Sequence, residues 1–188
     1  MSTSGTRALQ RKVIEMLDLM NLEVQVDLDF TVARRRARLG RLKALLLRQG
    51  IRSTLLSSDE IRRSVPVSGT TCRGMRTVEV SRIVGSVGKH EQFDSNFMPL
   101  SGVSPERWMR IDRAFRVGEL PSVSLLRIGE DYFVIDGNHR VSVARFHRVE
   151  WIDAEVTECK SLGTRPAKRA LDHPVHGTAG RVAAAASL

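Results

Sequence analysis

The chain has 188 residues, a formal net charge of +9 and an apolar fraction of 41%. This length suits one domain with extensions or two small domains, and a core of Leu, Val, Ile and Ala, because aromatic residues make up only 5%. Its two cysteines, Cys72 and Cys159, cannot by themselves form a disulfide framework or a zinc site. The sequence has no run of apolar residues typical of a membrane span or a secretion signal, so we expect a cytoplasmic protein with no membrane partner.

The positive charge is concentrated in the two flanks of the chain. Residues 1–75 carry +7, residues 76–158 carry −2 and residues 159–188 carry +4. If the chain binds DNA, RNA or an acidic partner, the N-terminal third is the better candidate surface, because phosphate backbones and other anions attract clustered Lys and Arg. An ordinary solvated helix face is the alternative. The nucleic-acid candidates lie on one side of a predicted helix: Arg34, Arg38, Arg41 and Arg48.

Helices are predicted for most of the N-terminal third. Helical spacing of apolar residues indicates an amphipathic helix over residues 6–21 and another over 31–50, with arginines on one side and leucines on the other. Residues 22–30 fit a strand and a helix equally well, with helix favoured from Asp29 onward. The apolar residues at this spacing are Leu9, Val13, Leu17, Met20, Val24, Leu28, Val32, Leu39, Leu42 and Leu46.

Turn-forming residues divide the chain into segments. A short helix is predicted over 58–64, where Ser57 and Glu60 have capping-box spacing. Residues 64–75 are rich in Ser, Gly and Thr and are interpreted as a linker. This linker would separate a basic helical extension from a domain. The expected boundaries are 1–63 for the extension, 64–75 for the linker, 76–158 for the domain and 159–188 for a disordered tail.

The central segment mixes strand and helix patterns, which predicts an α/β fold with a small mixed sheet and packed helices. Ser104 followed by Pro105 indicates a helix start. Trp108, Phe115 and Trp151 are interpreted as packed residues rather than base-stacking platforms. The expected elements are a strand over 77–84, a loop over 85–102, a helix from 104 to 117, a hairpin over 122–135, a helix after 138 and a final strand over 151–158.

The most site-like segment is Asp136-Gly137-Asn138-His139-Arg140, where a strand runs directly into a helix. Gly137 permits a sharp turn, and the helix start presents free N–H groups and the positive end of the helix dipole. Arg140 adds a permanently charged fork suited to phosphate oxygens, and His139 can exchange a proton near neutral pH. This combination is typical of an anion-binding site.

Local structure offers an alternative interpretation for each residue of this segment. Asp136 or Asn138 would be an ordinary helix cap, and Arg140 would pair with Glu155 or another acidic neighbour. Asp136 has two further alternatives, namely holding a metal ion and orienting His139. No cluster of residues with metal-ligand spacing is predicted elsewhere, and His147 is interpreted as a histidine at the end of a helix.

The run VIDGNHRVSVAR resembles the signature of the ParB/sulfiredoxin superfamily, in which a strand leads to Gly-x-x-Arg at a helix start. The order of predicted elements over residues 76–158 fits the same superfamily. The resemblance implies a ParB-like domain that binds a nucleotide. ParB proteins continue with a DNA-reading helix-turn-helix and a dimerisation segment. No such DNA-reading helix is predicted in the 30 residues after Glu158.

Some residues of this segment match the family motifs and others do not. ParB-type proteins have Gly-Glu-Arg-Arg here, of which Gly137 and Arg140 match. Sulfiredoxins have Gly-Cys-His-Arg, but Asn138 replaces the reactive cysteine, so the sulfiredoxin reaction is not expected. Free-serine kinases of the superfamily have Asp-Gly-x-His-Arg, which fits best. Asp94 and Glu91 are candidates for the acidic residue that those kinases need.

The segment Gly85-Ser86-Val87-Gly88-Lys89 contains half of a phosphate-binding Walker A loop. The full template requires Gly where Ile83 stands and Ser or Thr where His90 stands, so a P-loop enzyme is excluded. Superfamily members place further nucleotide contacts after their first strand, which implies a phosphate-facing role for Ser86 and Lys89. A solvated loop is the alternative.

These observations predict a ParB-like nucleotide- or phosphate-binding module, regulatory or DNA-associated. Its nucleotide would be CTP, ATP or ADP, with Mg²⁺ as an accompanying ion. The predicted binding residues are Gly137, Asn138, His139, Arg140, Ser86 and Lys89. The alternative is a Mg²⁺-dependent phosphotransferase or nucleotide hydrolase, with His139 and Asp136 as catalytic residues. DNA, a second copy of the chain or another protein are the expected partners.

Overall fold

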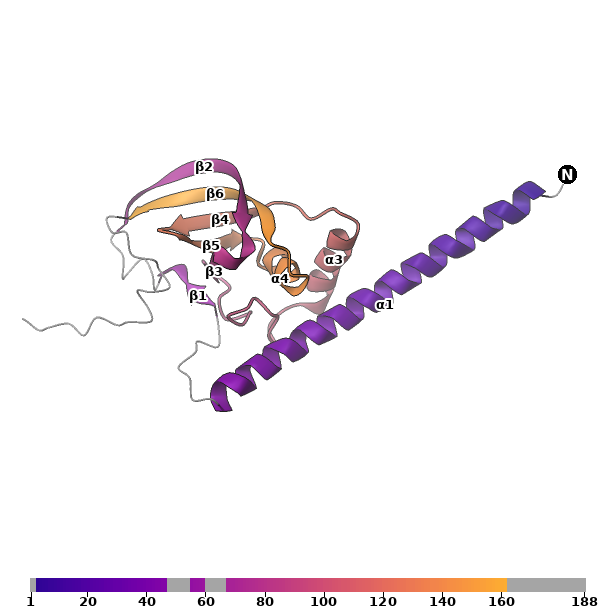
Figure 1. The fold of residues 1–188 in the computed structure, drawn as a ribbon, viewed down its shortest axis with the longest axis horizontal. Helices are drawn as coiled ribbons and strands as arrows, with labels where there is room; N and C mark the ends of the chain where they lie inside the picture. The colour runs from indigo at the N-terminus through magenta and orange to yellow at the C-terminus, as the bar shows by residue number, and fades with distance from the viewer. Residues whose placement is uncertain (1–2, 47–54, 60–66, 162–188) are drawn as a thin grey trace, which may run out of the picture.

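The computed structural model describes residues 3–46, 55–59 and 67–161, where helices pack on a six-stranded mixed sheet (Figure 1). The α/β fold class and the helical N-terminal part are as predicted. The elements are α1 (Thr3–Leu46), β1 (Leu56–Ser57), β2 (Val67–Glu79), the 3-10 turn η1 (Val80–Arg82), β3 (Ile83–Ser86), α3 (Pro105–Arg116), β4 (Val123–Ile128), β5 (Asp131–Asp136), α4 (Asn138–Phe146) and β6 (Trp151–Ser161). Within the described ranges, no helix combines the length and hydropathy required to cross a membrane.

The sheet has the strand order β1-β3-β5-β4-β6-β2. Strands β4 and β5 form the predicted antiparallel hairpin, and β3 and β6 run parallel to β5 and β4 on either side of it. At one edge β1 pairs in parallel with β3, which requires Gly85 because a Cβ there would collide with the Leu56 carbonyl. No sequence pattern predicts β1, since a two-residue strand has no periodicity.

The segment predicted as a linker over 64–75 is, from Val67 onward, the first part of β2. Its small and polar residues form a strand because β6 offers an antiparallel partner along the whole length, from Val67 opposite Ser161 to Glu79 opposite Trp151. The single strand predicted over 77–84 is divided by η1 into the end of β2 and the start of β3. Most of the short helix predicted over 58–64, and residues 162–188 of the predicted tail, lie outside the described residues.

One continuous helix, α1, covers residues 3–46, so the strand alternative for residues 22–30 is wrong. The face that packs on the domain is also not the leucine face. The buried residues of α1 are Val26, Phe30, Ala33 and Ala37, whereas Leu28, Leu39 and Leu42 are each more than half exposed. Small residues allow close approach of the helix to the domain, and this decides which face is buried.

Contacts between α1 and α3 hold the long helix against the domain. Arg113 donates to both carboxylate oxygens of Glu23, at 2.8 and 2.5 Å, and Arg116 pairs with Asp29. Immediately after Asp29 on α1, the Phe30 ring lies 5.5 Å from the ring of Trp108. The N-terminal end of α1 extends away from the sheet (Figure 1).

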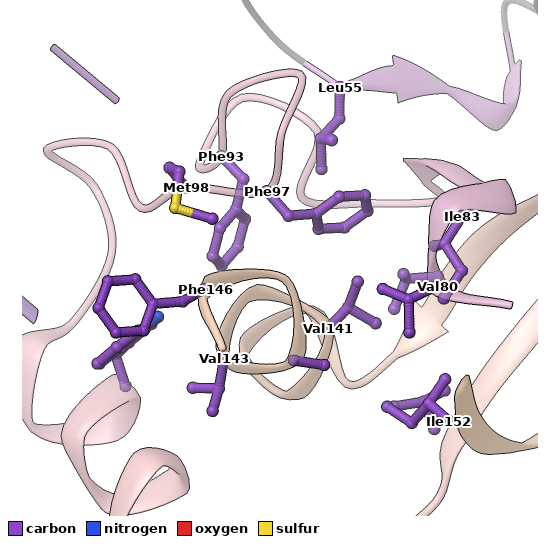
Figure 2. Packing of buried hydrophobic residues seen from close by; sticks show 14 of the residues in the cluster. Leu55, Val80, Ile83, Phe93, Phe97, Met98, Val141, Val143, Phe146 and Ile152 are labelled. Carbon is purple, nitrogen blue, oxygen red and sulfur yellow. The ribbon is translucent and has the colours of Figure 1, made fainter. Parts of the chain in front are cut away.

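The main core lies between the sheet and its helices. Figure 2 shows Phe93, Phe97 and Met98 of the loop after β3 lying over α4, whose other side faces Ile83 and Ile152 of the sheet. Trp108 is fully buried and donates to the Ser142 hydroxyl at 2.9 Å, so its predicted core role is confirmed.

Trp151 was predicted to pack, but 56% of it is exposed. The reason is the alternation of side chains along β6. Ile152, Ala154 and Val156 face the core, which places Trp151 on the opposite side of the strand.

Candidate functional site

The site is built on the turn between β5 and α4. Gly137 has φ 104°, and a Cβ there would lie 2.8 Å from Cγ1 of Val123, so glycine is required for both conformation and space. Gly137 is itself the N-cap of α4, with no side-chain cap hydrogen bond. The expectation that Asp136 or Asn138 caps the helix is therefore wrong. The first N–H groups of α4 are left without a side-chain acceptor, which suits an anion.

A cavity of about 500 Å³ opens in front of this turn. Its walls come from the loop after β3, the outer side of α3, the end of β5 and the start of α4. The lining residues are Gly88, Lys89, Arg107, Arg110, Ile111, Pro121, Ile135, Asp136, Gly137, Asn138, His139 and Arg140. The predicted residues Lys89 and Asp136 to Arg140, separated by almost fifty positions in sequence, therefore share one cavity.

Four cationic side chains line this cavity, against one carboxylate among the described lining residues, that of Asp136. Lys89 and Arg140 were predicted as phosphate contacts. Arg107 and Arg110 were missed, because on α3 they have the spacing of an ordinary exposed helix face. Only the packing of α3 beside α4 directs them to the same space, so no local sequence signal could have identified them.

Arg140 is held in place at the rim of the cavity. Its Nη2 lies 2.5 Å from Oδ2 of Asp136, one helical turn back, and its Nη1 donates to the Ser122 carbonyl. Arg140 therefore has an acidic partner, as the alternative interpretation of the sequence predicts, but the partner is Asp136 rather than Glu155. The Arg140 side chain remains 18% exposed and lines the cavity, so the ion pair orients the guanidinium without removing it from the site.

Asn138 and His139 line the cavity, and each has a buried polar atom without a hydrogen-bond partner among the described residues. Both residues are more than nine-tenths buried, and neither Oδ1 of Asn138 nor Nε2 of His139 has a hydrogen-bond partner. The edge contact between the His139 and Phe93 rings, at 5.5 Å between centroids, fixes the imidazole. Buried polar atoms without hydrogen-bond partners are rare in folded proteins, and some of them have a functional role.

The electrostatics of the cavity act on His139. Burial lowers the pKa of His139 from 6.5 to about 4, assisted by the positive charges of Arg107, Lys89 and Arg110 and opposed by Asp136. The imidazole is therefore neutral at pH 7. Burial is the main cause of the low pKa, and the nearby cations add a positive potential that a bound anion would offset.

Other candidates from the sequence lie outside the cavity lining. Ser86 is buried, donates to the Val134 carbonyl at 3.3 Å and accepts from the Lys89 N–H at 3.3 Å, so it positions the loop that carries Lys89. Oδ1 of Asp94 accepts the backbone N–H groups of Asn96 and Met98, both at 2.8 Å. Burial raises the pKa of Asp94 despite these bonds. Neither Asp94 nor Glu91 lines the cavity.

The nucleic-acid candidates lie on α1, away from the cavity. The guanidinium of Arg34 lies over the Phe30 ring at 5.7 Å, and Arg38 and Arg41 are exposed. Arg48 falls outside the described residues. Their contact with DNA remains a prediction.

Asp29, Asp112 and His147 form a cluster whose ligand atoms lie within 4.8 Å of one another. Nε2 of His147 is 2.5 Å from Asp112, and Arg116 pairs with both carboxylates. Because Arg116 pairs with both carboxylates and His147 contacts Asp112, the cluster is explained as a network that joins α1, α3 and α4. His147 follows the last residue of α4, as predicted.

Neither cysteine of the chain lines the cavity. Cys72 is exposed on β2, and Cys159 is buried on β6.

Comparisons with known proteins complete the description of the site. No family model and no curated protein matches the sequence. Among solved structures, the crystal structure of sulfiredoxin from Arabidopsis thaliana is similar over 44% of this chain and 82% of that chain, with a TM-score of 0.34 and 10% sequence identity. We draw no conclusion about activity from a likeness at this level.

Proposed function

We propose that this protein is a nucleotide- or phosphate-binding module whose phosphate site is the cavity at the start of α4. The observation that carries the proposal is the convergence of Lys89, Arg107, Arg110 and Arg140 on a cavity that also contains an uncapped helix N-terminus. Mutual repulsion of four cations at one site costs stability unless an anion compensates it. A polyphosphate supplies that compensation, together with acceptors for guanidinium and backbone N–H groups.

The unpartnered side chains of the cavity support a ligand with more than a phosphate group. Asn138 Oδ1 accepts hydrogen bonds, and His139 Nε2 can donate or accept one, depending on the tautomer. A ribose hydroxyl or a base amino group supplies the complementary donor. Among the described lining residues the only carboxylate is that of Asp136, whose Oδ2 pairs with Arg140. Mg²⁺ would therefore arrive coordinated by the nucleotide phosphates.

Thermal unfolding with CTP, ATP, ADP, GTP, pyrophosphate and inorganic phosphate, each with and without Mg²⁺, tests this proposal. A ligand of the native state raises the unfolding midpoint in proportion to its saturation. Arg107→Ala should raise the dissociation constant by roughly 10- to 100-fold, the usual effect of losing a charged hydrogen bond. Arg76→Ala is the matched control, because Arg76 is an exposed arginine on β2, outside the cavity lining. Equal shifts in the wild type, Arg107→Ala and Arg140→Ala would refute the cavity as the site.

The second candidate is a Mg²⁺-dependent phosphotransferase or nucleotide hydrolase. It is favoured by His139, a neutral imidazole that lines the cavity and whose buried Nε2 has no hydrogen-bond partner among the described residues. A neutral imidazole nitrogen is a suitable proton acceptor for an attacking hydroxyl. Phosphate release or transfer that disappears in His139→Gln, while nucleotide binding persists, would establish this activity. If nucleotides bind but none is hydrolysed or used for phosphate transfer, the protein is a binding module and not an enzyme of this kind.

A further inference from the structure

The exposed side of α1 carries a continuous apolar stripe that the domain does not cover. We define the apolar stripe as Val13, Leu17, Met20, Val24, Leu28, Val32, Leu39, Leu42 and Leu46, each between 40% and 73% exposed. The average step along the stripe is about 3.7 residues, with Arg35 in its one gap, so a straight helix keeps these residues on one side. That side lies nearly opposite Val26, Phe30, Ala33 and Ala37, which contact the domain. An exposed apolar surface of this length, roughly 50 Å, is typical of an interaction surface.

Charge along α1 is divided into two halves. Residues 13–33 contain five acidic residues and no Lys or Arg, whereas residues 34–43 contain six basic residues and no acid. Two parallel copies of this helix would place like charges side by side. Two antiparallel copies would place the acidic half of each helix beside the basic half of the other.

The two ends of the apolar stripe share the symmetry of the charge. At its start Val13, Leu17 and Met20 are four and three residues apart, and at its end Leu39, Leu42 and Leu46 are three and four apart. The first two steps are therefore the same from either end, whereas the middle of the stripe does not repeat in this way. In an antiparallel pair with a two-fold axis, Val13 faces Leu46 of the second copy, Leu17 faces Leu42, and Met20 faces Leu39.

We propose that two copies of this chain associate through their α1 helices as an antiparallel pair along the apolar stripe. On one border of the stripe Asp18 of each copy meets Lys43 of the other, and on the other border Asp27 meets Arg34. These side chains are all on α1 and form no ion pair within the described part of one chain. The inference does not depend on the cavity at α4, because the stripe faces away from α3.

Light scattering of the full chain tests the association, with an expected mass of twice 21.0 kDa at micromolar concentration. Leu17→Lys should raise the dissociation constant by about 100-fold or more, because each dimer contains the change twice and places it opposite basic residues. Leu19→Lys is the matched control: Leu19 is 61% exposed on the same helix but lies off the stripe, so this variant should remain dimeric. A monomeric wild type, or an unchanged dimer in Leu17→Lys, would overturn the proposal.

A charge exchange tests the antiparallel orientation. Asp18→Lys and Lys43→Glu should each weaken association at low salt, and the double variant should restore it, because each exchanged pair is again opposite in sign. Failure of the double variant to recover would exclude the antiparallel pair. A monomeric wild type that binds duplex DNA, and loses this binding in Lys43→Glu, would assign the basic half of α1 to nucleic acid and overturn self-association.

Discussion

At the scale of single residues, His139 shows most directly how position decides chemistry. As a free side chain it would be partly protonated near neutral pH. On the first turn of α4 it is buried beside the Phe93 ring and faces a cavity lined with cations, so its pKa falls to about 4. The folded protein therefore disfavours the protonated imidazole of His139, so protonation of this residue lowers the free energy of unfolding.

We expect His139 to make the unfolding free energy pH-dependent in acid. Between pH 6.5 and about 4 the unfolded chain binds a proton that the folded protein does not, so stability falls as the pH decreases through this range. Above pH 6.5 this loss of unfolding free energy is absent, and at pH 4 it is on the order of 2–3 kcal/mol. Urea unfolding of the wild type and His139→Gln from pH 4 to 7 measures it. If the unfolding free energy depends on pH equally in both proteins, His139 is not the group that causes the loss of stability in acid.

At the scale of elements, the docking of α1 rests on a short middle section of a long helix. Phe30 is 5% exposed and contacts Trp108, and ion pairs of Glu23 and Asp29 with α3 lie to one side of it. Partly exposed ion pairs contribute little, so the burial of Phe30 and the neighbouring alanines carries most of the docking energy.

Phe30→Ala should therefore lower the unfolding free energy by about 3 kcal/mol, as expected for a large cavity in a core. Chemical denaturation measures this loss. Gln25→Ala is the control, because Gln25 is exposed on the same helix and its truncation should change stability by less than about 0.5 kcal/mol. Equal small effects of the two changes would mean that α1 does not depend on this contact.

At the scale of the whole molecule, protection from solvent is distributed unevenly. Strand β5 lies between β3 and β4, and its residues Tyr132 and Val134 belong to the main core while Phe133 packs on the opposite face. The middle of α1 has one covered face, and residues 11–20 are exposed on every side.

Hydrogen exchange should follow this order when the protein is dilute. Amides of residues 132–134 should exchange slowest, those of residues 26–37 at an intermediate rate, and those of residues 11–20 fastest, because local opening is easiest where little surface is buried. Mass spectrometry of peptic fragments provides the measurement. Equal exchange in the two parts of α1 would contradict its docking on the domain.

The sequence by itself determined α3, α4, the hairpin and the motif from Asp136 to Arg140, because these depend on local periodicity, turn residues and capping. It could not determine that residues 67–75 form a strand, since β6 supplies the hydrogen bonds that stabilise it. Nor could it decide which face of α1 is buried, because two faces of that helix are apolar and only α3 and α4 select between them. Arg107 and Arg110 joined Lys89 and Arg140 only through tertiary packing, which brings charges from distant segments around one cavity.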